Sequence, residues 1–406
     1  MKCRHCKNTL EHTFLDLGFA PPSNAYLTKD QLSAPELTLP LRLFVCENCW
    51  LVQTEDFTLP SDHFDYDYAY YSSTSKTWLK HAAEFVAMVI ERFKLDANSF
   101  VVEVASNDGY LLRNFLNPRI PCLGIEPASG TAQAAERLGI PVLKKFFSSE
   151  LARELANKQR ADLIIGNNVY AHVADINDFT SGIYELLKDD GVVTLEFPHL
   201  LQLIDNNQFD TVYHEHFSYL SLQAVERIFK QARLRIWDVE QVPTHGGSLR
   251  VYGCRFDARH EMRPSVDMLR QQEVAKGLST LKHYKDFQNR ADRVKDDLLS
   301  FLIQQKRNGK TVIAYGAAAK GNTLLNYAGV KKDLLSYVCD AAAAKQGKFL
   351  PGSHIPIVPP SRLCDLKPDV VLVLPWNILD EVLEQQQNIK SWGGRFAVAV
   401  PTLRLI

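Results

Sequence analysis

The sequence predicts an α/β fold in which two sheet-and-helix units follow a small cysteine-bearing module and are joined by a helical connector. Short apolar runs alternate with segments of helical periodicity from Asn98 onward and again from Thr311, a pattern typical of parallel sheets flanked by helices. The length of 406 residues allows about two to four domains. We expect the boundaries at 1–70, 71–255, 256–308 and 309–406.

Charge and hydrophobicity argue against several classes of protein. The 46 basic and 47 acidic side chains nearly cancel, so no overall field attracts a nucleic acid or an anionic membrane. Apolar runs such as 370–374 are far shorter than the roughly 20 residues of a membrane span, and the first ten residues lack a signal-peptide stretch. We expect a cytoplasmic protein with no nucleic-acid or membrane partner; its oligomeric state stays open.

Four of the eight cysteines form two CxxC pairs, CRHC at 3–6 and CENC at 46–49. Each tight turn can place two thiolates on one edge of a zinc tetrahedron, and two such turns complete a structural site. An alternating apolar stretch at 39–45 can bring the second pair back to the first. We expect a structural zinc ion on Cys3, Cys6, Cys46 and Cys49; the alternative is two unrelated pairs of buried cysteines.

The segment FDYDYAYYSSTS, at 64–75, is rich in tyrosine. A phenol ring combines a flat apolar face with a hydrogen-bonding end, which suits a sugar or a base, and a tyrosine-rich packing surface is the equal alternative. A helix with apolar residues at helical spacing is expected next, at 78–93. Beyond it we expect strands at 100–104, 121–125, 163–165 and 192–196 and helices at 130–138 and 180–187. This order is Rossmann-like.

The loop after the first of these strands has the composition of a ligand-binding turn, VVEVASNDGYLL, but lacks the GxGxxG pattern that holds a pyrophosphate. The next strand ends at Glu126, about 20 residues on, where a carboxylate can hold both hydroxyls of a ribose. The loop and Glu126 together favour a diphosphate-free adenosine compound, S-adenosylmethionine, over NAD. The residues expected to bind it are Glu103, Ala105, Ser106, Asn107, Asp108, Gly109 and Glu126, with Asn167 and Asn168 after the third strand.

Residues suited to proton transfer gather in FDTVYHEHFSYLS, at 209–221, where Tyr213, His214, Glu215 and His216 are consecutive. HEH is not the HExxH helix of zinc hydrolases, whereas a carboxylate beside imidazoles, which titrate at about 6.5, suits acid–base work near neutral pH. A polar edge strand is the alternative. His172, in NNVYAHV, is placed at the carboxyl edge of the same sheet.

The remaining motifs indicate places for an anion. In THGGSLRVYGC, at 244–254, a Gly-Gly turn lets Ser248 and Arg250 face an anion, or merely starts a strand. Long helices are expected at 264–308. From Thr311, TVIAYGAAAKGNTLLNY again predicts a strand, a small-residue turn and a helix, whose free N–H groups and Lys320 suit a phosphate, with Asn322 beside them; a purely structural turn is the alternative.

The motifs CRHC, CENC, YYSSTS, EVASNDGYLL, NNVYAHV, YHEHFSYLS, HGGSLRVYG, YGAAAKGNTLLN and PGSHIPI, taken in this order, resemble the sugar C-methyltransferases, among them the tetronitrose C-3′ methyltransferase. The resemblance covers essentially the whole chain. It implies a class I methyltransferase domain between the zinc module and a second Rossmann-like domain, with S-adenosylmethionine as cofactor. It also implies a nucleotide-linked 4-keto-deoxysugar as substrate. The sequence departs at Ala105, where many relatives carry glycine.

The resemblance further implies that the active site includes His172, Tyr213, Glu215 and His216. We expect His216 to take a proton from the carbon beside the ketone, Glu215 to orient it, and Tyr213 or His172 to donate to the ketone oxygen. The family uses one tyrosine of the YDYAYYSS segment, which we place at Tyr68 or Tyr71.

Two other functions fit parts of the sequence. A nucleotide-sugar epimerase or oxidoreductase would bind a nicotinamide in the second α/β unit, but the GAAAKG turn lacks GxGxxG. A zinc-ribbon adaptor would bind nucleic acid or protein, but the near-zero charge and the YHEH cluster argue against it.

Overall fold

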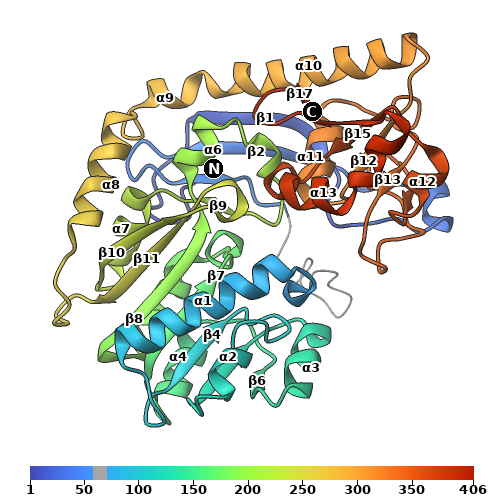
Figure 1. The fold of residues 1–406 in the computed structure, drawn as a ribbon. Coiled ribbons are helices and arrows are strands. Elements are labelled where there is room, and N and C mark those ends of the chain that lie inside the picture. The colour runs from blue at the N-terminus through green and yellow to red at the C-terminus, as the bar shows by residue number, and fades with distance from the viewer. Residues whose placement is uncertain (58–70) are drawn as a thin grey trace.

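The computed structural model of the chain describes residues 1–57 and 71–406. The strands of these residues form three sheets, in the N-terminal, central and C-terminal parts of the molecule (Figure 1). The long helix α10 (Phe287–Arg307) runs along one side, from the central part to the C-terminal part. Among the described residues, we find no helix with both the length and the apolar character needed to cross a membrane.

The N-terminal sheet is antiparallel, in the order β1 (His12–Ala20), β2 (Leu39–Val45), β3 (Val52–Thr54) and β9 (Ser218–Tyr219), with the short helix η1 (Asp30–Ser33) between β1 and β2. In β2 every second side chain, Leu41, Leu43 and Val45, is buried, because successive side chains of a strand point to opposite faces. Strand β9 comes from much later in the chain and pairs with β3, so the N-terminal sheet is completed by the segment that follows the YHEH motif.

The central sheet has the order β10-β11-β8-β7-β4-β5-β6. Its parallel strands are β4 (Val101–Val104), β5 (Cys122–Ile125), β6 (Val142–Leu143), β7 (Ala161–Asn167) and β8 (Leu187–Pro198). All four residues of β4 are buried, as expected of a central parallel strand covered on both faces. The expected strands are confirmed, but β10 (Leu234–Val242) and β11 (Ser248–Arg255) extend the sheet in antiparallel fashion, which the alternating pattern did not predict.

The helices of the central part follow the strands. They are η3 (Ser72–Thr74), α1 (Lys76–Phe93), α2 (Arg113–Leu116), α3 (Ser129–Arg137), α4 (Ser149–Ala156), η4 (Tyr170–His172), α5 (Ile176–Leu186), α6 (Leu200–Asp205), η5 (Phe209–Thr211), α7 (Leu222–Gln231) and η6 (Thr244–Gly246). The Ser75 side chain accepts a hydrogen bond from the Trp78 N–H and so begins α1, which ends at Lys94 in the left-handed conformation (φ 52°).

A helical connector leads to the C-terminal sheet. It consists of α8 (Pro264–Ala275), α9 (Leu281–Lys285) and α10. The sheet has the order β14-β13-β12-β15-β16-β17, with β12 (Val312–Tyr315), β13 (Val338–Cys339), β14 (Ile357–Val358), β15 (Val370–Val373), β16 (Arg395–Val398) and the antiparallel β17 (Arg404–Leu405). Its helices are α11 (Ala319–Tyr327), α12 (Arg362–Leu366), η7 (Trp376–Ile378), α13 (Leu379–Gln385) and η8 (Gln387–Trp392).

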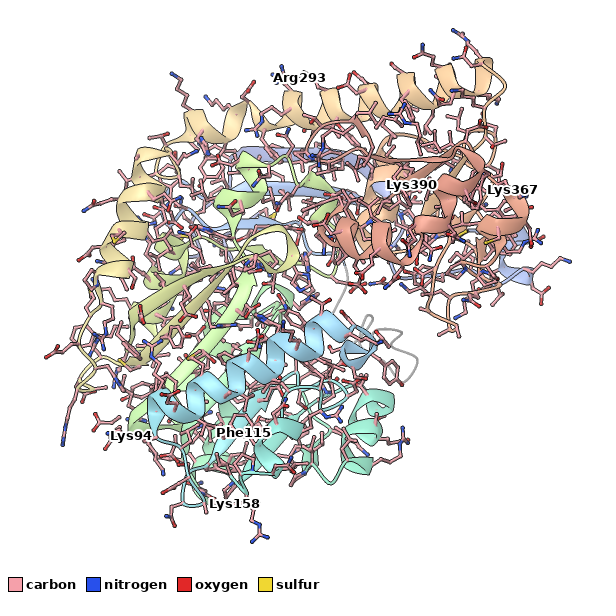
Figure 2. The ribbon with its side chains drawn as sticks, in the orientation of Figure 1. Lys94, Phe115, Lys158, Arg293, Lys367 and Lys390 are labelled. Atoms are coloured by element: carbon pink, nitrogen blue, oxygen red, sulfur yellow. The ribbon has the colours of Figure 1, made fainter. Side chains whose placement is uncertain are left out.

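One hydrophobic cluster joins the first part of the chain to the last. It includes Leu15 of β1, Leu43 of β2, Phe287 of α10 and Val338 of β13. The ring of Phe14 stacks on that of Phe287, with 4.8 Å between the ring centroids. Figure 2 shows the division between inside and outside: Phe115 is fully buried, whereas Lys94, Lys158, Arg293, Lys367 and Lys390 are exposed. The N-terminal module is therefore packed on the connector and the C-terminal unit.

Candidate active site

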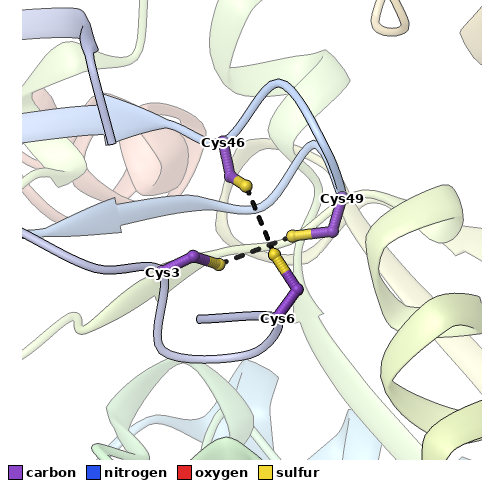
Figure 3. Close-up of side chains that lie close together, drawn as sticks. All are labelled: Cys3, Cys6, Cys46 and Cys49. Carbon is purple, nitrogen blue, oxygen red and sulfur yellow. Dashed lines mark hydrogen bonds between the residues drawn. The ribbon is translucent and has the colours of Figure 1, made fainter. Parts of the chain in front are cut away.

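Four cysteine sulfurs meet at the N-terminal end of the chain (Figure 3). The Sγ atoms of Cys3, Cys6, Cys46 and Cys49 all lie within 4.8 Å of one another, and the pairs Cys3–Cys49 and Cys6–Cys46 are 3.5 Å apart. Thiolates bound to tetrahedral zinc at about 2.3 Å lie about 3.8 Å from each other, so the cluster fits this ion. Four sulfurs fill the coordination sphere, and the metal therefore stabilises the module without an open position for chemistry.

A cavity of about 1490 Å³ is lined by all three parts of the chain. Asn24 and Tyr26 come from the N-terminal module, Glu126 and His216 from the central part, and Lys320 from the C-terminal unit. Glu126 lies directly after the carboxyl end of the parallel strand β5, where open α/β sheets bind ligands, whereas His216 lies between η5 and β9. The site is therefore an interface between units rather than a pocket within one of them.

The loop after β4 brings its backbone to the cavity in an unusual conformation. Ala105 (φ 57°) and Asn107 (φ 49°) are both left-handed, which costs a residue with a side chain roughly 1–2 kcal/mol. The Glu126 carboxylate, at the end of β5, accepts hydrogen bonds from the Asn107 and Ala128 N–H groups, both at 2.9 Å. Glu126 thus holds the loop in place while lining the same cavity. The left-handed φ of Ala105 explains why glycine suits this position.

The predicted cofactor residues fall into two groups. Ala105, Asn107, Glu126, Asn167 and Asn168 line the cavity. The others, Glu103, Ser106, Asp108 and Gly109, are buried but are not part of the lining. Asp108 accepts a hydrogen bond from the Ser73 N–H, and Gly109 is required by packing, because a Cβ there would lie 2.5 Å from Ile140.

Several buried polar atoms near this loop lack a partner within the described part of the chain. They are both carboxylate oxygens of Glu103, the Ser106 hydroxyl and the Asn167 amide. Burial, and next the Glu126 charge, raise the pKa of Glu103 well above its usual value. Buried polar groups are rarely left unpaired. Of these residues, Asn167 also lines the cavity, so its amide is open to the ammonium or hydroxyl groups of a ligand there. The donor set therefore fits S-adenosylmethionine.

Two histidines at the cavity wall are held by the same kind of hydrogen bond. His172 Nδ1 lies 2.9 Å from the Glu215 carbonyl oxygen, and His216 Nδ1 lies 3.0 Å from that of Thr211. Each carbonyl can only accept, so each Nδ1 carries the proton and Nε2 carries the lone pair. The ring centroids are 4.6 Å apart. Burial, and next the charge of His172, lower the pKa of His216 well below its usual value, so that this imidazole is neutral near pH 7.

Tyr213 and Glu215 flank this histidine pair and also line the cavity. The Tyr213 ring lies 4.0 Å from the His216 ring. The Glu215 carboxyl accepts a hydrogen bond of 2.7 Å from the Asn24 side-chain amide, and burial raises its pKa to about 7. The four predicted catalytic residues are therefore brought together, with an amide of the N-terminal module bound to one of them.

Lys320 approaches the cavity from the start of α11. Its ammonium donates to Asn377 Oδ1 at 2.6 Å and lies 4.6 Å from the Trp376 ring centroid. Burial lowers the pKa of Lys320, and the nearby Asp210 opposes this shift. The Trp376 N–H donates in turn to the Asp210 carboxylate at 2.7 Å, so the C-terminal unit contacts the residue directly before Thr211.

The other predicted substrate residues are not brought to the cavity wall by the described structure. Arg250, in β11, pairs with Glu196 and Glu240, and the Ser248 hydroxyl donates to the Thr244 carbonyl. Asn322 is fully buried and donates to the Ser23 carbonyl. Tyr71, before η3, is not part of the lining, and Tyr68 lies outside the described residues.

Among the lining residues that sequence reasoning missed are Asn24 and Tyr26, from the N-terminal module, and His245. The Tyr26 hydroxyl donates to the Ala317 carbonyl at 2.6 Å, and so ties this module to the turn before α11. Asn24 and Tyr26 carry no local signal, because their place depends on contacts far apart in sequence. For His245, the sequence signal was the pair of glycines that follows it.

Three family models match the chain. A zinc binding domain matches residues 3–64, a methyltransferase domain matches 78–239, and a C-methyltransferase C-terminal domain matches 243–401. Among curated proteins, C-methyltransferase NovU of Streptomyces niveus is 33% identical over 406 residues, covering 100% of this chain and 96% of NovU.

Two solved structures are similar to less than half of this chain, at low sequence identity. An S-adenosylmethionine-dependent methyltransferase of Clostridium acetobutylicum is 13% identical, with a TM-score of 0.35, and the match covers 44% of this chain and 92% of that one. Magnesium protoporphyrin IX methyltransferase of Synechocystis is 12% identical, with a TM-score of 0.34, over 44% of this chain and 79% of that one.

Proposed function

The chain belongs to the C-methyltransferase family, and from this membership we propose that it methylates a carbon atom beside the ketone of a nucleotide-linked 4-keto-deoxysugar. One observation carries the proposal: a neutral histidine, His216, with its Nδ1 proton fixed by a carbonyl, lines the same cavity as the cofactor loop and Glu126. The proposed base and the methyl donor would therefore share one cavity.

The cofactor residues bind and orient the donor. Glu126 would hold the ribose hydroxyls, and Asn107 and Ala105 would bring the loop backbone against the cofactor. Glu103 is buried outside the cavity lining and would act only from behind this loop. When bound, S-adenosylmethionine supplies a methyl group on a positively charged sulfur that needs no further activation. The residues around it have to align the acceptor carbon with that methyl group and keep water out.

The proposed reaction has two steps. His216 Nε2 takes the proton from the carbon beside the ketone, and the electrons of that C–H bond become those of an enolate. The Tyr213 hydroxyl donates a hydrogen bond to the oxygen on which negative charge develops. His172, the alternative donor, has its Nδ1–H on the Glu215 carbonyl, and its neutral ring has no second N–H to donate. The carbon then forms a bond to the methyl group as the methyl–sulfur bond breaks, and the proton remains on His216. A low pKa suits this base, because the imidazole is unprotonated before the sugar binds.

The charge of the cavity supports an acceptor that carries phosphate. Lys145, Lys320, Lys345 and Lys348 all line it, and Lys320 is half-buried. A diphosphate would be attracted to these ammonium groups. All eight cysteines are free of disulfides, which supports a reducing compartment, and we place the protein in the cytoplasm.

The test is an incubation with S-adenosylmethionine labelled with carbon-13 in the methyl group and a panel of dTDP-, GDP- and UDP-4-keto-6-deoxysugars. We expect the label to appear in one product as a methyl group on a carbon next to the ketone, observed by NMR. Label on an oxygen atom, or no transfer to any member of the panel, would contradict the proposed reaction.

A further inference from the structure

The turn between β10 and β11 brings His245 to the cavity in a left-handed conformation, with φ 53°. The two glycines that follow are fixed by close packing on both sides. A Cβ on Gly246 would lie 2.3 Å from the Trp376 ring, and one on Gly247 would lie 2.7 Å from the Gln202 side chain. The turn therefore has no room to change its path, and the position of the His245 ring follows from it.

His245 faces a second left-handed residue from a different strand end. Asn168, after β7, has φ 54°, and its side-chain amide donates to His245 Nε2 at 3.3 Å. Non-glycine residues in this region cost about 1–3 kcal/mol each and persist only where the surrounding structure holds them. Two such residues are joined here by their side chains at one cavity wall. The surrounding structure therefore holds a strained backbone in place at this wall, and the strained backbone orients a polar side chain.

A buried network holds the turn from behind. The Glu196 carboxylate accepts hydrogen bonds from the Thr244 hydroxyl at 2.9 Å and from Arg250 at 2.7 Å, and His81 lies 3.0 Å from the same carboxylate. The Ser248 hydroxyl donates to the Thr244 carbonyl. Ser248 and Arg250 thus hold the turn in place, and the turn positions His245 at the cavity wall.

The ring of His245 is set up as a hydrogen-bond donor. Because Nε2 accepts from Asn168, the proton of the neutral ring lies on Nδ1, for which the described residues provide no partner. The edge of the Trp78 ring, at 5.2 Å between centroids, restricts its rotation. Burial lowers the pKa of His245 to about 4, and the charge of Lys320 acts on it in the same direction. Lys320 and His245 also lower the pKa of His216, so the three groups share one region.

We propose that His245 is an acceptor-binding residue of this site, whose Nδ1–H donates a hydrogen bond to the ketone oxygen of the substrate. This inference rests on the proposed function. The bond would strengthen as the neighbouring carbon loses its proton and charge moves onto that oxygen. His245 would thus act on the opposite end of the same C–C=O unit from His216.

The test compares two substitutions that accept the left-handed backbone. His245→Gly removes the ring, whereas His245→Asn keeps an N–H donor near the place of Nδ1. For His245→Gly we expect kcat/KM to fall by about 10²–10³, as for loss of an oxyanion donor, and exchange of the substrate hydrogen with deuterated water to slow by a similar factor when S-adenosylhomocysteine is bound. His245→Asn should recover at least about tenfold of this loss.

Affinity for S-adenosylmethionine alone, measured by calorimetry, separates this role from simple support of Asn168. We expect His245→Gly to bind the cofactor within about threefold of the wild type. The shape of the pH–rate profile above pH 6 should be unchanged in His245→Asn, since the imidazole is neutral there. Near-normal turnover of His245→Gly, or a loss of cofactor affinity as large as the loss of turnover, would overturn the assignment. A wild-type protein that methylates none of the keto sugars would overturn the proposed function and this role with it.

Discussion

The proton affinity of His216 is determined by its surroundings rather than by a carboxylate partner of its own. Its Nδ1 proton goes to the Thr211 carbonyl, and burial, His172 and Lys320 all disfavour its charged form. In the proposed mechanism, His216 is unprotonated over the physiological range and acts as a base only when the acceptor proton becomes acidic. That mechanism therefore requires groups that bind the ketone oxygen and so raise this acidity.

The first prediction concerns His216 itself. His216→Asn should bind S-adenosylmethionine nearly normally but lose methyl transfer by about 10²–10⁴, because the step that removes the proton is lost. Single-turnover kinetics should place the loss in the chemical step. Tyr213→Phe is the matched comparison, since it keeps the ring and removes the hydroxyl. A larger loss in Tyr213→Phe than in His216→Asn would make the tyrosine the base.

The second prediction uses the raised pKa of Glu215. Its value of about 7 in the folded chain exceeds the usual value of 4.5, so between these pH values the unfolded chain releases this proton and the folded chain keeps it. The stability linked to Glu215 is therefore fully present below about pH 4.5 and is lost as the pH rises through 7. Glu215→Gln, which keeps an acceptor for Asn24, should reduce the fall in unfolding free energy over this range by about 2–3 kcal/mol.

Denaturant titrations of both proteins at pH 5, 6, 7 and 8 would check this. The difference in unfolding free energy between the wild type and Glu215→Gln, followed over pH, separates the contribution of Glu215 from those of Glu103 and Asp210. The pKa values of these two residues are raised as well. Parallel curves for the wild type and Glu215→Gln would show that the carboxyl does not titrate in this range.

Sequence alone was informative at this scale where residues with related chemistry are adjacent. Tyr213, Glu215 and His216 were predicted as catalytic residues because they are nearly consecutive; the structure brings all three to the cavity wall, and their catalytic role stays a prediction. His245 was not identified, because its place depends on the packing of Gly246 against Trp376, a residue more than a hundred positions away. The role of Arg250 was equally hidden, since its partner Glu196 lies on a neighbouring strand.

At the scale of elements, the pairing of β3 with β9 links the metal site to the catalytic segment. Strand β3 begins three residues after Cys49, and Ser218 of β9, paired with Gln53, comes two residues after His216. The Thr54 hydroxyl also donates to the His216 carbonyl at 3.3 Å. A displacement of the turn that holds Cys46 and Cys49 would therefore move strand β3, and β3 contacts the segment that carries His216.

The third prediction follows from this pairing. Cys49→Ser should reduce bound zinc from about one ion per chain to near zero and lower Tm by about 10 °C or more, because an open three-sulfur site no longer holds β3. Metal analysis and calorimetry would measure both. Cys364→Ser is the matched control, since Cys364 is exposed and distant from the cluster. An equal effect of the two substitutions, or full zinc in Cys49→Ser, would contradict a structural metal site.

Strands β4, β5, β7, β8 and β12 of the two α/β units were predictable because each is an apolar run between turn residues, and they lie where expected. The pattern could not predict that β10 and β11 run antiparallel, since hydrophobic periodicity carries no strand direction. Nor could it predict β9, because two residues give no periodicity at all. The domain boundaries at 70, 255 and 308 stay predictions.

At the scale of the whole molecule, the contact between Trp376 and Asp210 connects the C-terminal unit to the base. Asp210 is fully buried, accepts the indole N–H, and precedes the residue whose carbonyl holds His216. Lys320 of the same unit lies over the Trp376 ring. Docking of the C-terminal unit is thus linked to the segment that holds His216, the proposed base, through the indole hydrogen bond and through that from the Thr323 hydroxyl to the Val212 carbonyl.

The fourth prediction tests this coupling. Trp376→Phe keeps an aromatic ring on the Gly246 turn but leaves the buried Asp210 carboxylate short of a donor, at a cost of about 1–3 kcal/mol in stability. We expect kcat to fall as well, by about tenfold, because the Thr211 carbonyl is no longer held. Trp392→Phe is the control: this indole donates to the Pro368 carbonyl within the C-terminal unit, so stability should fall and kcat should not. Equal kcat in the two variants would contradict the coupling.

The hydrophobic cluster that β1 shares with α10 also limits how early the chain can mature on the ribosome. Leu15 and Leu43 emerge among the first residues, but Phe287 and Val338, which cover them, are made near the end. If the ribosome adds about 5–20 residues per second, the apolar face of the N-terminal module stays uncovered for roughly 15 to 60 s. Throughout this interval the incomplete chain exposes an apolar surface that chaperones can bind, and Phe287 and Val338, which later cover it, both lie in the last third of the sequence.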